Sequence, residues 1–509
     1  MKKIWDTSAP SFDYPNNIKG VYEDIYINQR KSYTNWIGKI SSRFRADLDW
    51  WISVVSSRNP YNSKLFHSIC ILESLKILKK KNQLPSKIIV NSSALKNTIK
   101  TYFKNKDIIV KNKFNFFSKL KIFYYIFWPF IYSTSIFILS KIYKDEDKIK
   151  KISENRNNIL IDTFKTSEDL DIDRYYNKLE KKKINKKNNI FFVPTILYVK
   201  LLKLPSLIKK IKKNKNFILK EDFIFFSDII YALCYIFRKK KFYINYNKYK
   251  NWDLSKIIKE EFLYYANFQA ILISIINYRF AKNIKSKNIK LKKVIDWFEN
   301  TTVDRGWNLG FRKFYPHIPV IGYQGYTLYR QFMCLHPSQA EYLYKVIPKN
   351  LVVIGKAYKK IRKEFCKNIK VSVGPALRFE HVFANNNIQK RKYDILVILS
   401  LDLAASNKIL SNVIKTRWVE SGKKIFIKAH PLMPLSKILS KNKIPENFIV
   451  FTPGAIYGPA KQWPVKYFRE LGKKLHKVFG HKILLMGTID DFELVDYEFH
   501  PHIKGKVAI

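Results

Sequence analysis

The chain has 509 residues, long enough for two domains of ordinary size, and its hydrophobic fraction of 47% excludes global disorder. Lysine and arginine outnumber aspartate and glutamate by 95 to 40, and the net charge of +55 favours anionic partners. Because Lys, Asn, Ile, Tyr and Phe are abundant together, part of this charge is compositional, and the chain carries no nucleic-acid recognition motif. We therefore rank a nucleic-acid-binding protein last and expect no nucleic acid among the partners.

The first 380 residues alternate short strands with helices, the pattern of an α/β domain. The expected strands are KIIVN (87–91), DIIV (107–110), NILIDTF (158–164), NIFFVPT (189–195), KKVIDWFEN (292–300) and IPVIGYQGY (318–326). The stretch VSVGPALRFEH (371–381) and the Asn-rich residues 384–392 predict an interdomain hinge.

Three apolar segments lie within this N-terminal part. Residues 122–140 carry no charge and just reach the length of a membrane span, with lysines beyond both ends. Pro129 in mid-segment, aromatics spread along its length and the symmetric lysines argue against a span. A buried core helix and a membrane-surface element are the other interpretations. Residues 223–237 and 262–280 contain polar side chains and are expected to form core helices.

A second α/β unit is predicted after the hinge. It contains the strands YDILVILSLD (393–402), KIFIKAHP (424–431), Phe448-Ile449-Val450 and KILLMGT (482–488), with helices near 404–421 and over 465–480.

The loop at 451–464, FTPGAIYGPAKQWP, is the most informative segment, because it lies between a strand and a helix, at the carboxyl edge where α/β sheets bind ligands. Gly454 and Gly458 let the backbone approach a ligand closely, and Lys461 adds positive charge at a helix N-terminus that already favours anions. It is not a Walker loop, since Lys461 is neither preceded by Gly nor followed by Ser or Thr. The structural alternative is a simple turn with a solvated lysine.

The loop resembles the nucleotide-sugar-binding domain of the lipopolysaccharide heptosyltransferases. The motif PGA…GPAK.WP is present as Pro453-Gly454-Ala455, Gly458-Pro459-Ala460-Lys461 and Trp463-Pro464, and the likeness covers about residues 448–509. The resemblance implies that Gly454, Gly458 and Lys461 lie at the phosphates of a nucleotide-sugar donor such as ADP-heptose. The family's later sugar-nucleotide elements are not seen before Ile509, so we expect a second domain that is truncated or fused.

A second resemblance covers roughly residues 45–432. The motifs WFEN, VIGYQGYT, LHPSQAEY, VSVGPALRF, YDILVILS and KIFIKAHP, with SSRNPYNSKLFHSICILESLK nearer the N-terminus, are similar to bacterial surface-carbohydrate (O-antigen and capsule) biosynthesis proteins. Near residue 445 the expected Gly/Ser-rich turn and acidic helix are replaced by the heptosyltransferase-like unit.

Glycosyl transfer needs a base for the acceptor hydroxyl and positive groups for the leaving diphosphate. Glu299 follows a strand at the expected carboxyl edge and is the first candidate base, with Asp304 second. For either carboxylate the alternative is to cap the helix that starts near Thr302 or to pair with an arginine. His430 ends the strand KIFIKA in an HP pair that resembles the donor-phosphate contact of bacterial sialyltransferases, or it is a plain turn histidine. No metal-ligand spacing or convincing DxD pair is present, so we expect metal-independent chemistry.

Four widely spaced cysteines without a CxxC pair favour buried thiols in a reducing cytoplasm, and the N-terminus lacks the apolar core of a signal peptide. The cysteines are Cys70, Cys234, Cys334 and Cys366.

Together the resemblances imply a GT-B fold, in which two Rossmann-like domains face a cleft: an acceptor-side domain over 1–380 with apolar helical insertions and a nucleotide-sugar-binding domain over 393–509. The expected function is a metal-independent glycosyltransferase without a cofactor, moving a sugar from a nucleotide-sugar to a lipid-linked or lipopolysaccharide acceptor. Basic and aromatic surfaces would place it on the anionic cytoplasmic face of the inner membrane. The alternative is a non-catalytic or degenerate partner protein in surface-glycan assembly.

Overall fold

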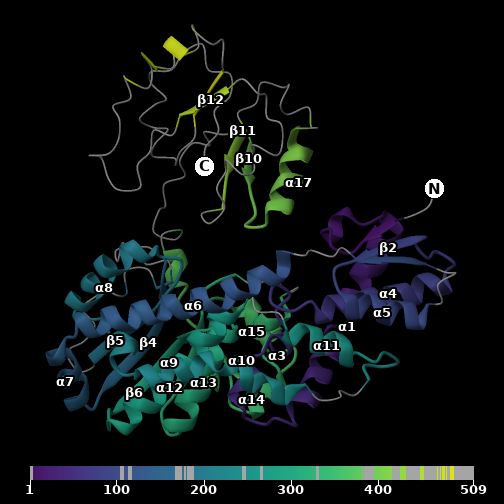
Figure 1. Ribbon diagram of the computed structural model, residues 1–509. Coiled ribbons are helices and arrows are strands. Elements are labelled where there is room, and N and C mark those ends of the chain that lie inside the picture. Colours follow the sequence, from purple (N-terminus) through teal and green to yellow (C-terminus); the bar gives the residue numbers. More distant parts are fainter. Residues whose placement is uncertain are drawn as a thin grey trace. The chain divides into compact units, whose positions relative to one another are not determined.

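The chain forms two compact units, residues 1–385 and 386–509 (Figure 1). The structure, a computed structural model, describes residues 4–103, 108–112, 117–166, 175–176, 179, 189–243, 248–263, 267–327, 332–380, 382, 395–414, 416, 425–430, 448–451, 467, 470–471, 473–475, 477 and 482–485. Each unit combines helices with parallel strands, which confirms the expected α/β class.

The centre of the first unit is a six-stranded sheet in which all strand pairs are parallel, with the order β5-β4-β6-β7-β8-β9. The strands are β4 (Asn158–Lys165), β5 (Asn189–Ile196), β6 (Leu291–Trp297), β7 (Val320–Gln324), β8 (Asn350–Val353) and β9 (Lys370–Val373). The chain begins this sheet at β4, adds β5 on one side and then continues on the other side with β6. This is the doubly wound order, and its topological switch point lies between β4 and β6.

The sequence predicted four of these six strands and missed two. The strands β4 to β7 lie where their apolar runs indicated. Strand β8 was hidden in a proline-marked segment, and β9 occupies residues that we assigned to the hinge. The hinge prediction is therefore wrong at its start, because residues 371–373 pair with β8 inside the sheet.

Helices cover both faces of this sheet (Figure 1). On one face, helices α12 (Phe268–Ser286) and α13 (Thr302–Phe314) share a core with Leu160 of β4 and Val294 of β6. On the other face, α8 (Leu204–Lys213) packs in a second core with Trp297 of β6. Strands buried on both faces must be apolar along most of their length, so a carboxylate at a strand end is conspicuous.

Glycines bring α12 and α13 unusually close together. A Cβ atom on Gly306 would lie 1.6 Å from the backbone oxygen of Ser274, and one on Gly310 would lie 2.9 Å from the Cβ of Ala281. Gly306 and Gly310 are four residues apart, so both fall on the face of α13 that contacts α12. The close contact lets Ser274 Oγ of α12 accept a hydrogen bond of 2.8 Å from the backbone N–H of Gly306.

The N-terminal part of the first unit has its own three-stranded parallel sheet, β1 (Ile4–Asp6), β2 (Lys87–Val90) and β3 (Ile109–Asn112). Strand β1 was not predicted, because three residues are too short a run to show a period. Helices α1 (Asn16–Ser41), α4 (Leu65–Lys80) and α5 (Ser93–Tyr102) pack in the same large core as this sheet.

The uncharged segment forms most of α6 (Phe117–Ile142), and little of it is buried. Within the described residues, Ile122–Ile142 is the one helix long and apolar enough to cross a membrane, with 17% of its most apolar window buried. That low burial contradicts the core-helix interpretation. The prediction holds for α12, which is largely buried, and only in part for 223–237, where α9 (Phe226–Leu233) and α10 (Tyr235–Arg238) expose several apolar side chains.

In the second unit two parallel strand pairs are described. Strand β10 (Ile395–Ile398) pairs with β11 (Ile425–Lys428), and α17 (Leu403–Ile414) connects them in sequence. Strand β12 (Phe448–Phe451) pairs in parallel with β13 (Lys482–Leu485), and described helical residues lie between them at 467, 470–471, 473–475 and 477. The predicted succession of strand, helix and strand is confirmed for these residues, and the loop between β12 and the helix lies outside the described residues after Phe451.

Candidate functional site

Two carboxylates meet at the switch point of the six-stranded sheet. Ile161 of β4 pairs with Ile295 of β6, so Asp162 and Asp296 are the next residues on adjacent strands and lie on the same face of the sheet. Both side chains are buried. The carboxyl ends of strands at a switch point are where open α/β sheets bind ligands. Neither residue was predicted as a site residue, although a carboxylate within an apolar strand was a visible signal in both β4 and β6.

The preferred base, Glu299, lies two residues beyond β6 and is half-buried. Its Oε1 accepts a hydrogen bond of 2.8 Å from the indole N–H of Trp297. Burial raises the pKa of Glu299, while the bond from Trp297 and the charge of Arg378 act to lower it. The structure therefore places Glu299 beyond the end of β6, as predicted, and burial shifts its pKa upward.

The second candidate, Asp304, has the capping role that we gave as its alternative. Its Oδ2 accepts from the backbone N–H of Thr301 at 2.8 Å and from that of Glu299 at 3.1 Å, in a capping box at the start of α13. Burial raises the pKa of Asp304, and the negative charge of Glu299 raises it further, against the bond from Thr301. Through its bond to the Glu299 backbone, Asp304 holds the first candidate in place.

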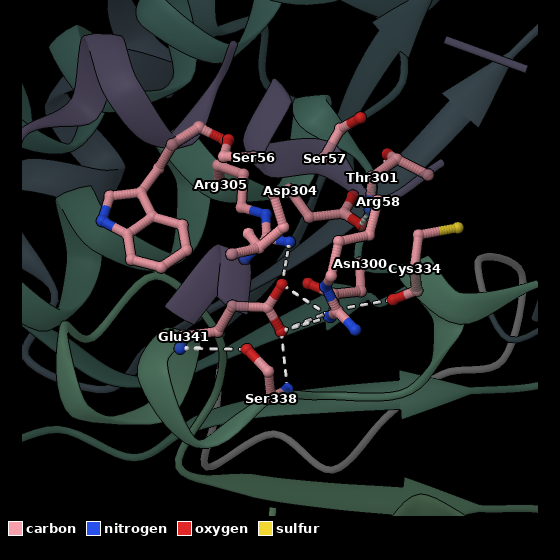
Figure 2. A network of polar contacts seen from close by, with 12 residues as sticks. Ser56, Ser57, Arg58, Asn300, Thr301, Asp304, Arg305, Cys334, Ser338 and Glu341 are labelled. Atoms are coloured by element: carbon pink, nitrogen blue, oxygen red, sulfur yellow. Dashed lines mark hydrogen bonds and ion pairs between the residues drawn. The ribbon is translucent and has the colours of Figure 1, made fainter. Parts of the chain in front are cut away.

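A buried ion network fixes the start of α13 to the rest of the unit (Figure 2). Glu341, from α14 (Gln339–Leu343), accepts from Arg305 at 2.6 Å and from Arg58 at 2.7 Å. Burial acts to raise the pKa of Glu341, but Arg305 and Arg58 outweigh it and hold the pKa at about 2. The glutamate is thus charged and fully compensated at neutral pH.

The same network holds the loop between β6 and α13. Asn300 adopts a left-handed backbone with φ of 56°, and its Nδ2 donates to Glu341 at 3.2 Å and to the carbonyl of Cys334 at 2.7 Å. Ser338 completes the contacts of Glu341 through its backbone N–H at 2.7 Å. Arg58 and Glu341 lie in motifs that resemble surface-carbohydrate biosynthesis proteins, but the sequence predicted no role for either residue. The Ser338-x-x-Glu341 spacing of a capping box was the one local signal.

A buried lysine completes the polar groups near the switch point. The Nζ of Lys220 donates to Thr195 Oγ1 at 2.7 Å and to Asn277 Oδ1 at 2.6 Å, joining the end of β5 to α12. Burial raises the pKa of Asp162 to about 7, the charge of Lys220 acts to lower it, and Glu299 acts to raise it. A carboxyl that titrates near neutrality at a ligand-binding edge is typical of functional sites.

The donor-side candidates lie in the second unit. His430 follows β11 and is half-buried, and Lys428 at the end of that strand is exposed. Gly454, Gly458 and Lys461 lie outside the described residues. Among the described residues, no group of three or more His, Cys, Asp or Glu side chains is placed to hold a metal ion. All four cysteines are free thiols, and three of them are buried while Cys234 is partly exposed.

The model of glycosyltransferase family 9 (heptosyltransferase) matches residues 423–504. This match supports the heptosyltransferase-like character of the C-terminal segment and a glycosyltransferase relationship in general. It begins ahead of the boundary near 448 that we predicted, so β11 and His430 fall within it together with the 451–464 loop. Searches of curated proteins and of solved structures found no significant match.

Proposed function

We propose that this protein is a glycosyltransferase that moves a sugar from a nucleotide-sugar donor to a carbohydrate acceptor. The family match over residues 423–504 carries the proposal, because it contains His430, Gly454, Gly458 and Lys461. The doubly wound sheet of the first unit, with carboxylates at its switch point, supports an acceptor-side role for residues 1–380. We include in the proposal the GT-B plan, in which two Rossmann-like domains face a cleft.

In the proposed mechanism Glu299 takes the proton of the acceptor hydroxyl as that oxygen attacks the anomeric carbon of the donor sugar. Trp297 and Asp304 hold the glutamate and its backbone in position. On the donor side, Lys461, His430 and the backbone N–H groups around Gly458 stabilise the charge that develops on the leaving diphosphate. These groups supply positive charge from the protein, so the proposed chemistry is independent of a metal ion.

The proposed acceptor is lipid-linked or part of lipopolysaccharide, reached from the cytoplasmic face of the inner membrane. Helix α6 supports this with an apolar stripe at helical spacing, whose side chains are each about half exposed or more: Phe123, Phe127, Ile131, Ile138 and Ile142. Next to it, α9 exposes Phe226, whose ring lies 6.1 Å from that of Phe137 of α6. Exposed Lys144 and Lys240 and the net charge of +55 suit an anionic lipid surface.

Donor binding tests the proposal. We expect calorimetry with a panel of nucleotide-sugars that includes ADP-heptose to show saturable binding. Lys461→Ala and His430→Ala should each weaken it about tenfold, as lost charge-assisted hydrogen bonds would. Lys359→Ala, which removes an exposed lysine of α15 (Lys356–Arg362), is the matched control and should change nothing. Absence of saturable binding to every nucleotide-sugar would refute the proposal.

The catalytic step has its own test. Glu299→Gln should leave donor affinity unchanged and lower turnover by about 10²–10⁴-fold, since it removes the base and keeps the side-chain size. Wild-type protein that binds a donor but transfers no sugar to lipopolysaccharide or lipid-linked acceptors would favour the non-catalytic partner protein instead.

Membrane association is tested by co-sedimentation with vesicles. Binding should require phosphatidylglycerol in phosphatidylcholine vesicles, fall with added salt, and be lost in Phe127→Glu. Equal binding to neutral vesicles, or unchanged binding of Phe127→Glu, would contradict the proposed surface.

A further inference from the structure

A set of buried polar side chains at the switch point has no use in the mechanism above. We call it the switch-point cluster: Asp162 of β4, Asp296 of β6, Gln324 of β7 and Asn308 of α13, with Lys220 beside them. Asp296 pairs with Gly322 in the sheet register, and Gln324 is the next residue of β7 on that same face. The cluster therefore gathers on the face that α12 and α13 cover.

Most of these side chains keep unused hydrogen-bonding capacity. Asp162 Oδ1, Asp296 Oδ1, Asn308 Oδ1 and both amide atoms of Gln324 are buried and have no partner among the described residues. The other carboxyl oxygen of Asp296, Oδ2, accepts a hydrogen bond of 2.6 Å from Asn308 Nδ2. Buried polar groups are nearly always paired in folded proteins, so an accumulation of unpaired groups at one point indicates a missing binding partner.

The unused atoms define the chemistry of that partner. Four are oxygens that can accept (Asp162 Oδ1, Asp296 Oδ1, Asn308 Oδ1 and Gln324 Oε1) and one is a donor (Gln324 Nε2). Burial raises the pKa of both aspartates, and a carboxyl that keeps its proton donates as well, so the partner must both donate and accept hydrogen bonds. Hydroxyl groups do both. A cationic ligand is disfavoured, because the positive charge of the buried Lys220 would repel it. A metal ion is disfavoured as well, since no group of three or more His, Cys, Asp or Glu side chains among the described residues is placed to hold one.

We propose that the switch-point cluster is a binding site for a sugar, held through its hydroxyl groups by Asp162, Asp296, Asn308 and Gln324. The assignment rests on the proposed function in one respect, since it takes this sugar to be part of the acceptor. Glu299 lies three residues beyond Asp296, and its charge acts on both Asp162 and Asp296. The cluster and the proposed base therefore belong to the same end of β6.

Saturation-transfer NMR on the full chain, without nucleotide, tests the site with the methyl glycosides of glucose, galactose, N-acetylglucosamine and heptose. We expect saturable binding of at least one glycoside. Asp162→Asn and Gln324→Leu should each weaken it about tenfold or more, because a sugar hydroxyl then loses a buried carboxyl or a buried amide partner. Two variants are made so that the test still works if one of them fails to fold. Thermal melting shows which variants are folded.

The matched control is Asp228→Asn, because Asp228 is a buried carboxyl of α9 that is paired with Arg279 and Asn283, outside the cluster. It should bind the glycoside as the wild type does. Absence of binding by the wild-type chain, or equal binding by folded Asp162→Asn, would overturn the assignment and leave the cluster a structural feature.

Nucleotide-sugar affinity separates this inference from the proposed function. Asp162→Asn should leave donor binding within about twofold of wild type, and Lys461→Ala should leave glycoside binding unchanged. If the wild-type chain binds a glycoside but no nucleotide-sugar, the proposed transferase function is refuted and the sugar-binding site stands. The reverse result would refute the site alone.

Discussion

Two buried charge clusters in the first unit use the same residue types in opposite ways. Around Glu341, two arginines, an asparagine and a backbone N–H supply hydrogen bonds to both carboxylate oxygens, and the pKa of Glu341 falls to about 2. In the switch-point cluster, Asp162 and Asp296 lie side by side with one lysine near them, and burial raises the pKa of both. The carboxylate of Glu341 is paired at both oxygens, whereas Asp162 and Asp296 each keep an unpaired carboxyl oxygen.

The difference separates a structural role from a functional one. A compensated ion network locks the chain, and here it ties Arg58 to Glu341 across 283 residues. Carboxyl groups left unpaired in the interior cost stability in the free protein, and a ligand that supplies the missing hydrogen bonds offsets that cost. The comparison predicts opposite outcomes when the two kinds of carboxylate are neutralised.

Glu341→Gln should produce the largest loss of stability. It leaves Arg58 and Arg305 as buried charges without a counterion, and removing one partner of such a network costs about 3–5 kcal/mol. Since the pKa of Glu341 is lowered to about 2, this stabilisation is complete above the ordinary pKa of 4.5 and is lost as the pH falls toward 2. Urea denaturation at pH 7 and at pH 3 measures both effects.

The control for this loss is Glu146→Gln, which removes an exposed carboxylate that pairs with Lys144 at the surface. It should change stability by less than about 0.5 kcal/mol. A Glu341→Gln variant as stable as this control would show that the buried network does not lock the unit.

Asp162→Asn should act in the opposite direction and increase stability. The folded protein holds the proton of Asp162 up to a pH of about 7, while the unfolded chain releases it near 3.8, so the wild type loses stability as the pH rises between those values. The variant lacks this loss and should be more stable at pH 8 by roughly 2–4 kcal/mol, with the difference shrinking toward pH 4. Thermal melting across this range is the measurement, and a destabilised variant at pH 8 would contradict the comparison.

Gly306→Ala tests the helix contact beside both clusters. The added Cβ would lie 1.6 Å from the backbone oxygen of Ser274, so α12 and α13 must separate, at a cost of about 1–3 kcal/mol. Gly20→Ala is the matched control, because nothing lies within 4 Å of its added Cβ in α1, and it should stabilise by roughly 0.5–1 kcal/mol. Denaturant midpoints that move in the same direction for both variants would show that the close helix contact is not required.

The features that could be predicted from the sequence are those that depend on neighbouring residues. The apolar runs of β4 to β7 are visible in sequence because each is long enough to fill a strand, and Glu299 was placed correctly since it follows the run that became β6. The capping role of Asp304 was also stated as an alternative, because a cap depends on residues three apart.

What the sequence could not predict depends on contacts between distant segments. The partners of Glu341 lie up to 283 residues away, and the pairing of Asp162 with Asp296 exists only after β4 and β6 become neighbours. Strands β8 and β9 have four residues each and occur in proline- or glycine-marked segments, where local signals favour a loop or hinge.

Asp304→Asn should have the smallest effect and decides between the two candidate bases. The amide oxygen can still accept from the backbone N–H groups of Thr301 and Glu299, so the cap survives and stability should change by less than about 1 kcal/mol. If Asp304 only positions Glu299, turnover should stay within about tenfold of wild type, with KM unchanged and the pH profile still set by Glu299. A loss as large as that of Glu299→Gln, at unchanged stability, would make Asp304 the base instead. The comparison of the two clusters would then change as well. The reacting carboxylate would lie at the start of α13, the segment that the Glu341 network holds in place.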